Sequence, residues 1–238
     1  MSDPKLPDRV RVYAIGDVHG CADLLDRLLG KIAQDIADHP QDRAELIFLG
    51  DYIDRGPHSK AVIDRLTSGD LPAPATFLAG NHEEMLLGFL ERPGEGMQWA
   101  FNGGEETLAS YGVSPDELSR HPEAARDRLL QVMPAAHLDF YKALQVSAVR
   151  GDYFFCHAGV RPGVPLDRQS RFDLVWIREP FLDYRGDLGK VIVHGHTPVR
   201  AVEIRPNRIG IDTGAFVWGR LTALALSGEA RKIIEVVR

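Results

Sequence analysis

Six side chains that could bind metal ions follow short apolar runs of the sequence, at the point where each run ends. They are Asp17, His19, Asp51, Asn81, His157 and His196. This set offers oxygen and nitrogen donors and no thiolate, which suits manganese, iron or zinc and disfavours an iron–sulfur cluster or a structural zinc site. Six donors are too many for one tetrahedral ion, so we predict two divalent transition-metal ions that share a carboxylate. Such a pair, held roughly 3.5–4 Å apart, is suited to hydrolysis at phosphorus. We expect Mn²⁺, with iron or zinc as alternatives.

Three neighbouring residues have types that would support this chemistry. Arg55 follows Asp51 on the same predicted loop, and its guanidinium matches the oxygens of a phosphate. His82 comes directly after Asn81 and must therefore lie beside the metals. Asp54 is placed to orient such a histidine, as carboxylates do in other catalytic pairs.

The apolar runs that precede these residues are predicted to be buried strands of an α/β fold. They cover residues 11–15, 45–49, 75–78, 153–155 and 190–193. Leucines and isoleucines between residues 24 and 36 have the spacing of one helix face, and a shorter helix is predicted near 60–66. Alternating strands and helices predict parallel strands, whose sites form at the carboxyl ends.

Residues 84–145 interrupt this pattern and are predicted to be a helical insertion within a single domain that spans residues 1–238. Helices are predicted at 84–91, at 105–111 and through much of 115–144, with turns at Gly94, at Gly96 and at 102–104. After the insertion the strand pattern resumes. Runs at 209–211, 221–226 and 232–237 are predicted to form an antiparallel meander.

Composition excludes several classes of protein. The chain has 238 residues, of which 44% are hydrophobic and 26% charged, an ordinary globular mix. The net charge of −6 argues against a nucleic-acid partner. No run approaches the ~18 apolar residues of a membrane span, and the first residues have no apolar signal core, so we expect a cytoplasmic protein. Cys21 and Cys156 have no metal or redox spacing and are expected to be small buried hydrophobes.

The motifs around these residues resemble those of a known family. Gly16-Asp17-Val18-His19-Gly20, Gly50-Asp51-Tyr52-Ile53-Asp54-Arg55-Gly56 and Gly80-Asn81-His82-Glu83 are similar to the three signature blocks of the PPP-type serine/threonine phosphatases. Cys156-His157-Ala158-Gly159 and Gly195-His196-Thr197 resemble the two later metal-histidine blocks. Further segments at 99–104, 175–179, 195–198 and 211–215 resemble the bacterial and phage branch, typified by the bacteriophage lambda phosphatase.

This resemblance implies a metallophosphoesterase-type β-sandwich of mixed sheets flanked by helices. It implies that Asp17 and His19 hold one metal, that Asp51 bridges, and that Asn81, His157 and His196 hold the second. His82, paired with Asp54, would be the general acid, while Arg55 and Arg178 would clamp the phosphate. Many relatives carry arginine two residues before the asparagine, and here that position is Ala79.

The function that we predict from these motifs is hydrolysis of a phosphate monoester by a metal-activated water, with a phosphorylated protein or a small phosphate ester as substrate. A serine/threonine or dual-specificity protein phosphatase fits best. The alternative is a diadenosine tetraphosphate hydrolase. Those enzymes share the metal site but alter the Asp-Arg of the second block and the Gly-His-Thr of the last, both of which this chain keeps. A catalytically inactive phosphoprotein-binding module would have lost metal ligands, and a nuclease would be less acidic.

Other polar residues have ordinary interpretations. His194 is predicted to be structural. Asp212 is predicted to be a turn or strand-end residue, and Asn102-Gly103-Gly104 a turn. Six glutamates are predicted to form a mostly solvated face: Glu83, Glu84, Glu91, Glu95, Glu105 and Glu106.

Overall fold

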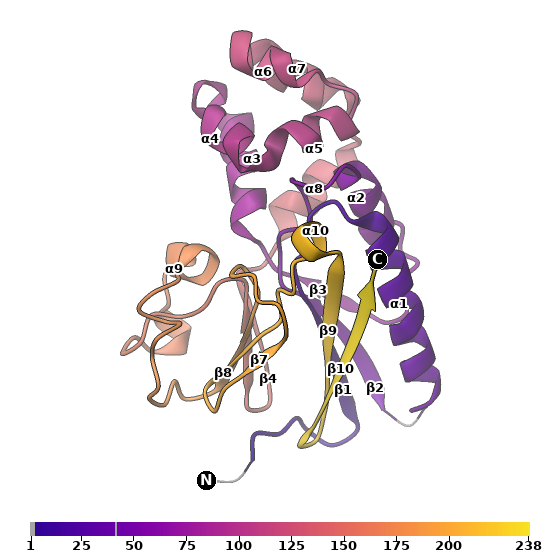
Figure 1. Ribbon diagram of the computed structural model, residues 1–238, viewed down its shortest axis with the longest axis vertical. Coiled ribbons are helices and arrows are strands. Elements are labelled where there is room, and N and C mark those ends of the chain that lie inside the picture. The colour runs from indigo at the N-terminus through magenta and orange to yellow at the C-terminus, as the bar shows by residue number, and fades with distance from the viewer. Residues whose placement is uncertain (1–2, 41) are drawn as a thin grey trace.

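The computed structural model describes residues 3–40 and 42–238, and it contains two five-stranded sheets. The first sheet has the order β10-β9-β1-β2-β3 and the second β4-β5-β6-β8-β7. Figure 1 shows the sheets facing each other, with helices on their outer sides. The predicted α/β fold, with mixed sheets flanked by helices, is confirmed.

The strands of the first sheet are β1 (Val10–Ile15), β2 (Arg43–Phe48), β3 (Ala75–Phe77), β9 (Arg220–Ser227) and β10 (Ala230–Val237). Those of the second are β4 (Ser147–Arg150), β5 (Tyr153–Cys156), β6 (Val191–His194), β7 (Glu203–Ile204) and β8 (Arg208–Gly210). Strands β1, β2 and β3 are parallel, as are β5, β6 and β8. The carboxyl ends of these parallel strands carry the predicted site.

Alternate residues of β1 enter two different hydrophobic clusters. Val12 and Ala14 pack between the sheets with residues of β5 and β6, whereas Tyr13 and Ile15 pack against α1 (Ala22–Ala37). A strand buried on both faces has no polar side, and this explains its continuous apolar run. Helix α1 follows the predicted spacing, with Leu24, Leu25 and their neighbours buried.

The helical insertion is present and forms the upper part of the molecule in Figure 1. Its helices are α3 (Asn81–Glu91), α4 (Met97–Trp99), α5 (Glu105–Ser110), α6 (Pro115–Arg120), α7 (Pro122–Val132) and α8 (Ala135–Ala143), with a 3₁₀ turn η1 (Pro93–Glu95) and a π-helical turn η2 (Ala100–Gly104). One hydrophobic cluster joins several of these helices to α1, α2 (Ser59–Thr67) and the first sheet. The single domain stays a prediction.

Two expectations about secondary structure were wrong in part. The meander holds for β9 and β10, which are antiparallel, but β8 pairs parallel with β6 in the other sheet. The prediction also missed β4 and β7, short strands at the two edges of the second sheet. Edge strands are buried on fewer sides, so their sequences carry a weaker apolar signal. The remaining elements are a 3₁₀ turn η3 (Leu166–Arg168) and the helices α9 (Arg171–Trp176) and α10 (Ala215–Trp218). None of the helices in the described part of the chain has the length and apolar character needed to cross a bilayer.

Candidate metal centre

The six predicted ligands all lie at the ends of strands on one edge of the two sheets. Asp17 and His19 follow β1, Asp51 follows β2, and Asn81 begins α3 just after β3. From the second sheet, His157 follows β5 and His196 follows β6. All six are buried, with at most 7% of each residue exposed. The parallel topology therefore gathers residues that are up to 179 positions apart in the chain, as the hydrogen bond between Asp17 and His196 shows.

Three of these residues adopt a strained backbone conformation. His19, Asp51 and His196 have φ angles of 42°, 53° and 63°, in the left-handed region that non-glycine residues rarely enter. Such strain costs of order 1–3 kcal/mol per residue and persists only where surrounding contacts enforce it. One such contact is the Asp51 carbonyl, which accepts the backbone N–H of His19 at 2.9 Å.

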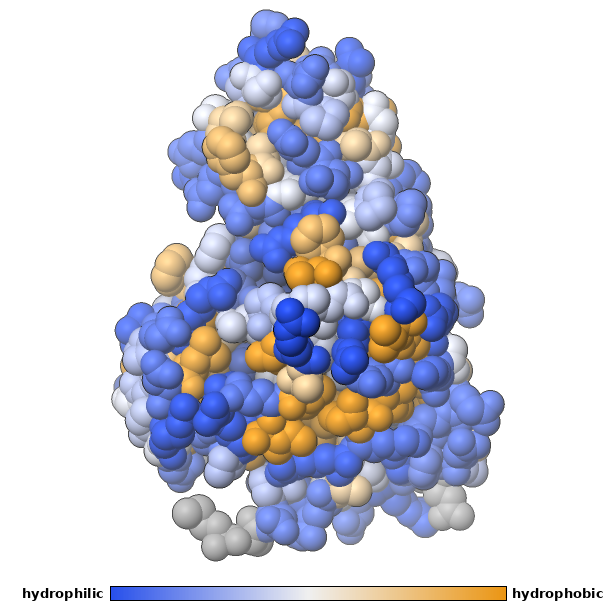
Figure 2. Space-filling model, in the orientation of Figure 1, coloured by the Kyte–Doolittle hydropathy of each residue, from blue (hydrophilic) through white to orange (hydrophobic). Residues whose placement is uncertain are grey.

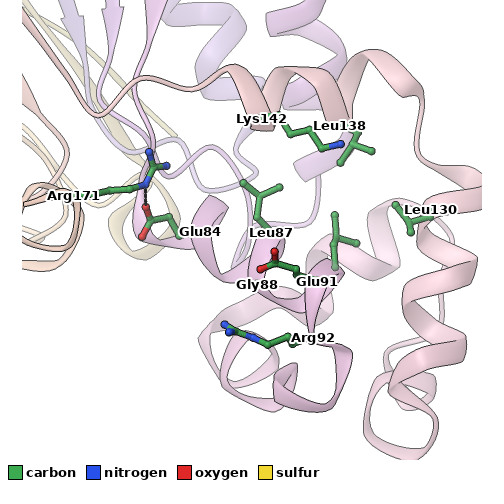
Figure 3. Close-up of a pocket in the computed structure, with 10 residues that line it drawn as sticks. Glu84, Leu87, Gly88, Glu91, Arg92, Leu130, Leu138, Lys142 and Arg171 are labelled. Carbon is green, nitrogen blue, oxygen red and sulfur yellow. Dashed lines mark hydrogen bonds and ion pairs between the residues drawn. The ribbon is translucent and has the colours of Figure 1, made fainter.

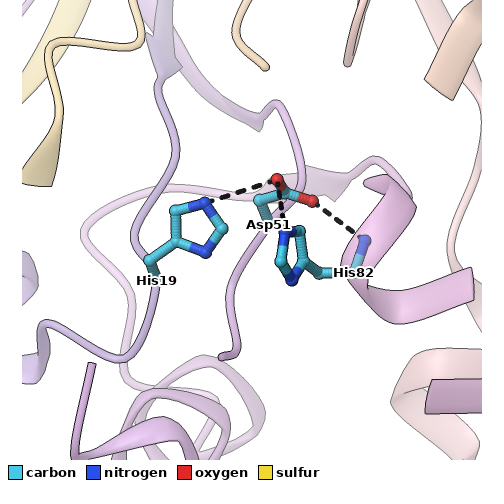
Figure 4. Close-up of side chains that lie close together, drawn as sticks. All are labelled: His19, Asp51 and His82. Atoms are coloured by element: carbon cyan, nitrogen blue, oxygen red, sulfur yellow. Dashed lines mark hydrogen bonds and ion pairs between the residues drawn. The ribbon is translucent and has the colours of Figure 1, made fainter. Parts of the chain in front are cut away.

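A first group of donor atoms consists of His19, Asp51 and His82, whose nearest ligand atoms all lie within 4.8 Å of one another (Figure 4). His19 Nε2 is 3.4 Å from Asp51 Oδ2, and His82 Nε2 is 3.8 Å from the same oxygen. The Nδ1–H of His19 donates to the Ile53 carbonyl at 2.9 Å. This bond fixes the tautomer, so Nε2 carries the lone pair that faces Asp51.

A second group consists of Asp51, His157 and His196. His157 Nδ1 donates to the Leu49 carbonyl at 2.9 Å. Its Nε2 is 3.4 Å from Asp51 Oδ1, 3.0 Å from Asn81 Oδ1 and 3.2 Å from His196 Nδ1. Asp51 thus belongs to both groups, which is the position that a shared carboxylate requires.

Asp17 lies beside the second group and belongs to neither trio. Its Oδ2 accepts the backbone N–H of His196 at 3.0 Å. Within the described residues its Oδ1 has no hydrogen-bond partner, and the same is true of His82 Nε2 and His196 Nε2. Buried polar atoms without partners are rare, and three in one site call for a ligand. Because these atoms are carboxylate oxygen and imidazole nitrogen, the site fits divalent metal ions.

Burial shifts the pKa values of several groups in the site. Burial and the nearby Asp212 raise the pKa of Asp17 well above its usual range. Burial raises the pKa of Asp212 itself to about 6. Burial also lowers the pKa of His19 to about 3 and that of His196 to about 2, so both imidazoles are neutral, the form that binds metals. Burial lowers the pKa of His157 as well, but the Asp51 carboxylate outweighs this effect and raises that pKa to about 10.

The predicted contact between His82 and Asp54 is present. His82 Nδ1 lies 2.7 Å from Asp54 Oδ2, and both side chains are fully buried. Asp54 also accepts hydrogen bonds from Trp99 Nε1 at 2.9 Å and from the Thr107 hydroxyl at 2.6 Å. Burial lowers the pKa of His82 to about 4. Three side chains from three segments (Asp54 directly, and Trp99 and Thr107 through Asp54) thus fix the imidazole with Nε2 toward the metal centre.

The two predicted phosphate-binding arginines differ in how they are held. Arg55 is half-buried, and after burial its charge is among the causes that lower the pKa of His19 and His82. Its backbone N–H donates to the Gly103 carbonyl at 3.1 Å. A Cβ on Gly103 would lie 2.7 Å from the Arg55 nitrogen, so this π-helical turn positions Arg55 and is more than the simple turn expected. Arg178 is exposed and contributes, after burial, to the lowered pKa of His196.

Glu83 corrects one prediction from the sequence. It was expected on a solvated acidic face, but it is fully buried. Its Oε2 accepts the backbone N–H groups of Asp51 at 3.0 Å and Gly80 at 2.9 Å, and its Oε1 accepts that of Tyr52 at 2.8 Å and, more weakly, that of Ile53 at 3.4 Å. The side chain therefore holds the loop that carries Asp51. A glutamate three residues after a helix N-cap was the available signal.

Four other residues have the following positions. Asp212 follows β8 as expected, but it lies close enough to Asp17 to raise its pKa. His194 is buried, with its ring 5.0 Å from that of Phe181, as the structural interpretation predicted. Ala79 is part of the hydrophobic core. Cys156 and the other cysteine, Cys21, are free and buried, as predicted.

Comparisons with known proteins place the chain in one family and agree with the fold. The chain matches the family described as calcineurin-like phosphoesterase over residues 10–223. A bis(5'-nucleosyl)-tetraphosphatase PrpE (asymmetrical) of Anoxybacillus flavithermus is 34% identical over 225 residues, covering 88% of each chain. A protein of the same name from Bacillus anthracis is 30% identical over 232 residues, again covering 88% of each chain. A crystal structure provisionally described as that of a diadenosine tetraphosphatase superimposes with a TM-score of 0.67 and 22% identity, covering 100% of this chain and 98% of that one.

Proposed function

The chain belongs to the calcineurin-like phosphoesterase family, and on that premise we propose that it hydrolyses bis(5'-nucleosyl) tetraphosphates asymmetrically, to a nucleoside triphosphate and a nucleoside monophosphate. The observation that carries the proposal is the similarity to tetraphosphatases along 88% of both chains at 34% and 30% identity. This favours the alternative in our sequence analysis over the phosphoprotein phosphatase of the phage-type branch, which these relatives do not support.

The motifs that separate a monoesterase from a tetraphosphatase in the sequence contain residues that support the metal centre. These motifs are Asp54-Arg55 of the second block and Gly195-His196-Thr197 of the last. Asp54 orients His82, and the backbone of His196 binds Asp17. Gly195 has no room for a side chain, because a Cβ there would lie 2.0 Å from Asp17 Oδ1. Asp54, Gly195 and His196 thus support the metal centre itself, which hydrolysis of either substrate would need, so their presence does not favour one substrate over the other.

Six residues of this chain would hold the metal ions. Asp17, His19 and Asp51 would hold one ion, and Asn81, His157 and His196 would hold the second together with Asp51. When bound, divalent ions supply Lewis acidity toward phosphate oxygens and a lowered pKa for a coordinated water. Mn²⁺ is our first choice for both sites, and iron and zinc accept the same donors.

The remaining residues bind and orient the substrate and supply a proton. Arg55 and Arg178 bind the oxygens of the phosphate under attack, where charge spreads in the transition state. In its protonated form, His82, held by Asp54 through Nδ1, gives a proton from Nε2 to the departing oxygen and returns to the neutral imidazole. A departing nucleoside triphosphate is a much weaker base than an alkoxide, so it needs this proton less. His82→Asn should therefore reduce hydrolysis of alkyl phosphates more than hydrolysis of dinucleoside tetraphosphates.

Product analysis tests the proposal. The protein is incubated with diadenosine tetraphosphate and Mn²⁺, and the nucleotides are separated by anion-exchange chromatography. We expect ATP and AMP in equal amounts, and neither from an Asp51→Asn variant. Two equivalents of ADP would refute asymmetric cleavage. If the dinucleotide stays intact while phosphoserine peptides are dephosphorylated under the same conditions, the proposal is wrong and the protein is a phosphoprotein phosphatase.

A further inference from the structure

A cavity of about 210 Å³ lies beside the metal centre, between α3, α4 and α9. Its lining includes the aromatic rings of Trp176 and Trp99, the thioether of Met85, the amide of Gln98 and the backbone of Gly88. Figure 2 shows the surface indented between the helices of the insertion and the part of the molecule that carries α9. A cavity of this size is smaller than a typical site for a whole ligand and suits one ring system of a larger one.

Both tryptophans connect this cavity to the metal centre. The ring of Trp176 meets that of His196 edge to face, with centroids 6.4 Å apart. Trp99 donates its Nε1–H to Asp54, the partner of His82. On the outer side, the ring of Phe172, a residue that is 67% exposed, stacks on that of Trp176, with centroids 6.3 Å apart. A series of aromatic rings thus leads from a candidate metal ligand to the surface.

The charged side chains around the cavity are already paired. Glu84 forms an ion pair with Arg171 that joins α3 to α9, as Figure 3 shows. Glu95 pairs with Arg92 at 3.1 Å. These pairs leave the cavity without a surplus of positive charge that would attract phosphate. Its aromatic walls favour a flat, neutral group, and the exposed Gln98 amide can both donate and accept hydrogen bonds at the edge of such a group.

We propose that this cavity is a nucleobase subsite, in which a purine of the dinucleoside polyphosphate stacks on Trp176. The inference rests on the proposed function, because it assumes a substrate that carries a base a few bonds away from the phosphorus under attack. It assigns a specificity-determining role to Trp176. It also explains why a metal centre that fits any phosphate ester would prefer a nucleotide.

Gly88 offers a way to fill the cavity without disturbing the fold. It lies on the exposed side of α3 between this cavity and a larger one of about 620 Å³, drawn in Figure 3, and it lines both. A Cβ on Gly88 would meet no atom within 4 Å. Leucine favours helices more than glycine does, so Gly88→Leu should keep or raise the melting temperature. Gly30 in α1 is equally open, and Gly30→Leu is the matched control on a helix far from the cavity.

The experiment measures how much the base contributes to binding. Hydrolysis of p-nitrophenyl phosphate is followed with excess Mn²⁺, and the inhibition constants of ATP and tripolyphosphate are compared in wild type, Gly88→Leu, Trp176→Leu and Trp176→Phe. Base–aromatic stacking predicts that Gly88→Leu and Trp176→Leu raise the inhibition constant of ATP, relative to that of tripolyphosphate, by roughly five- to a hundredfold. Trp176→Phe, which keeps an aromatic ring, should retain most of the wild-type preference for ATP over tripolyphosphate. The control variant Gly30→Leu should retain all of it. The KM for diadenosine tetraphosphate should rise in parallel.

Each outcome decides between the two proposals. If Gly88→Leu folds and leaves the ratio of the two inhibition constants at the wild-type value, the subsite is refuted, whatever Trp176→Leu does. If Gly88→Leu and Trp176→Leu weaken the binding of ATP and of tripolyphosphate by the same factor, Trp176 only supports His196 and the inference fails. If the ratio changes as expected but diadenosine tetraphosphate is not cleaved, the nucleobase subsite stands and the proposed function fails.

Discussion

Replacement of Glu83 by glutamine should be among the most destabilising conservative changes in this protein. Two carboxylate oxygens accept four backbone N–H groups, three of them at 2.8–3.0 Å. Glutamine turns one of these oxygens into an NH₂ group that cannot accept. The loss of stability is smallest if the NH₂ group replaces Oε1, the oxygen that accepts the backbone N–H groups of Tyr52 at 2.8 Å and Ile53 at 3.4 Å. One strong and one weak bond are then lost, and at about 1–3 kcal/mol per unsatisfied buried donor we expect a loss of about 2–4 kcal/mol.

Urea denaturation measures this loss as a lower midpoint with an unchanged slope. The matched control is Glu84→Gln, one position along the helix. Glu84 is only partly buried and pairs with Arg171 on the surface, so its loss should cost at most about 1 kcal/mol. Since the Glu83 hydrogen bonds hold the backbone of Asp51, the Glu83 variant should also retain less metal. Equal midpoints for the two variants would show that Glu83 does not anchor this loop.

Three further predictions concern the metal centre and acid stability. Gly195→Ala places a Cβ 2.0 Å from Asp17 Oδ1 and should therefore reduce metal affinity or activity by about 10–100-fold. Metal titration measures this loss, and wild-type affinity in the variant would contradict the close packing. Chelation by EDTA should abolish activity reversibly, while the circular dichroism spectrum of the folded protein is retained. Elemental analysis of Asp51→Asn should find less than one metal ion per chain, and full metal content in that variant would exclude a shared carboxylate. Burial raises the pKa of Asp35, but the hydrogen bond from Lys232 and neighbouring contacts outweigh it, so the pKa is lowered. The ionised carboxyl therefore stabilises the fold above its unfolded pKa of ~3.9, and this stability is lost as pH falls through the lower folded value. The midpoint difference between wild type and Asp35→Asn should shrink below about pH 5, and a constant difference would contradict this.

The sequence located the candidate metal centre because local patterns and topology act together there. Each apolar run predicted a buried strand, and each ligand-type residue came directly after a run. Parallel strands end at the same edge of a sheet, so Asp17 and Asp51, which follow neighbouring strands of the first sheet, had to lie near each other; His157 and His196 reach them from the second sheet only because the two sheets pack together. The pairing of His82 with Asp54 followed the same logic, because both residues flank predicted ligands.

Other features were not accessible in this way because they depend on contacts between distant segments. The run at 209–211 predicts a strand but not its partner, and in the structure β8 joins the second sheet beside β6. In the sequence, Glu83 looks like one of several neighbouring surface acids. In the structure it lies in the first turn of α3 and its carboxylate faces the loop after β2. Gly103 supports Arg55 across a separation of 48 positions, which no local pattern records.

By itself, the sequence determined the chemistry of the candidate donor atoms, the strands that precede them and the main helices of the chain. These depend on residue type and on hydrophobic periodicity, which are local properties of the chain. The tertiary structure alone decided what surrounds that site: the burial of Glu83, the placement of Trp176 against His196 and the cavity beside it. The physical reason is that burial and cavity shape arise from packing between segments that are far apart in the sequence, and substrate selection depends on that packing.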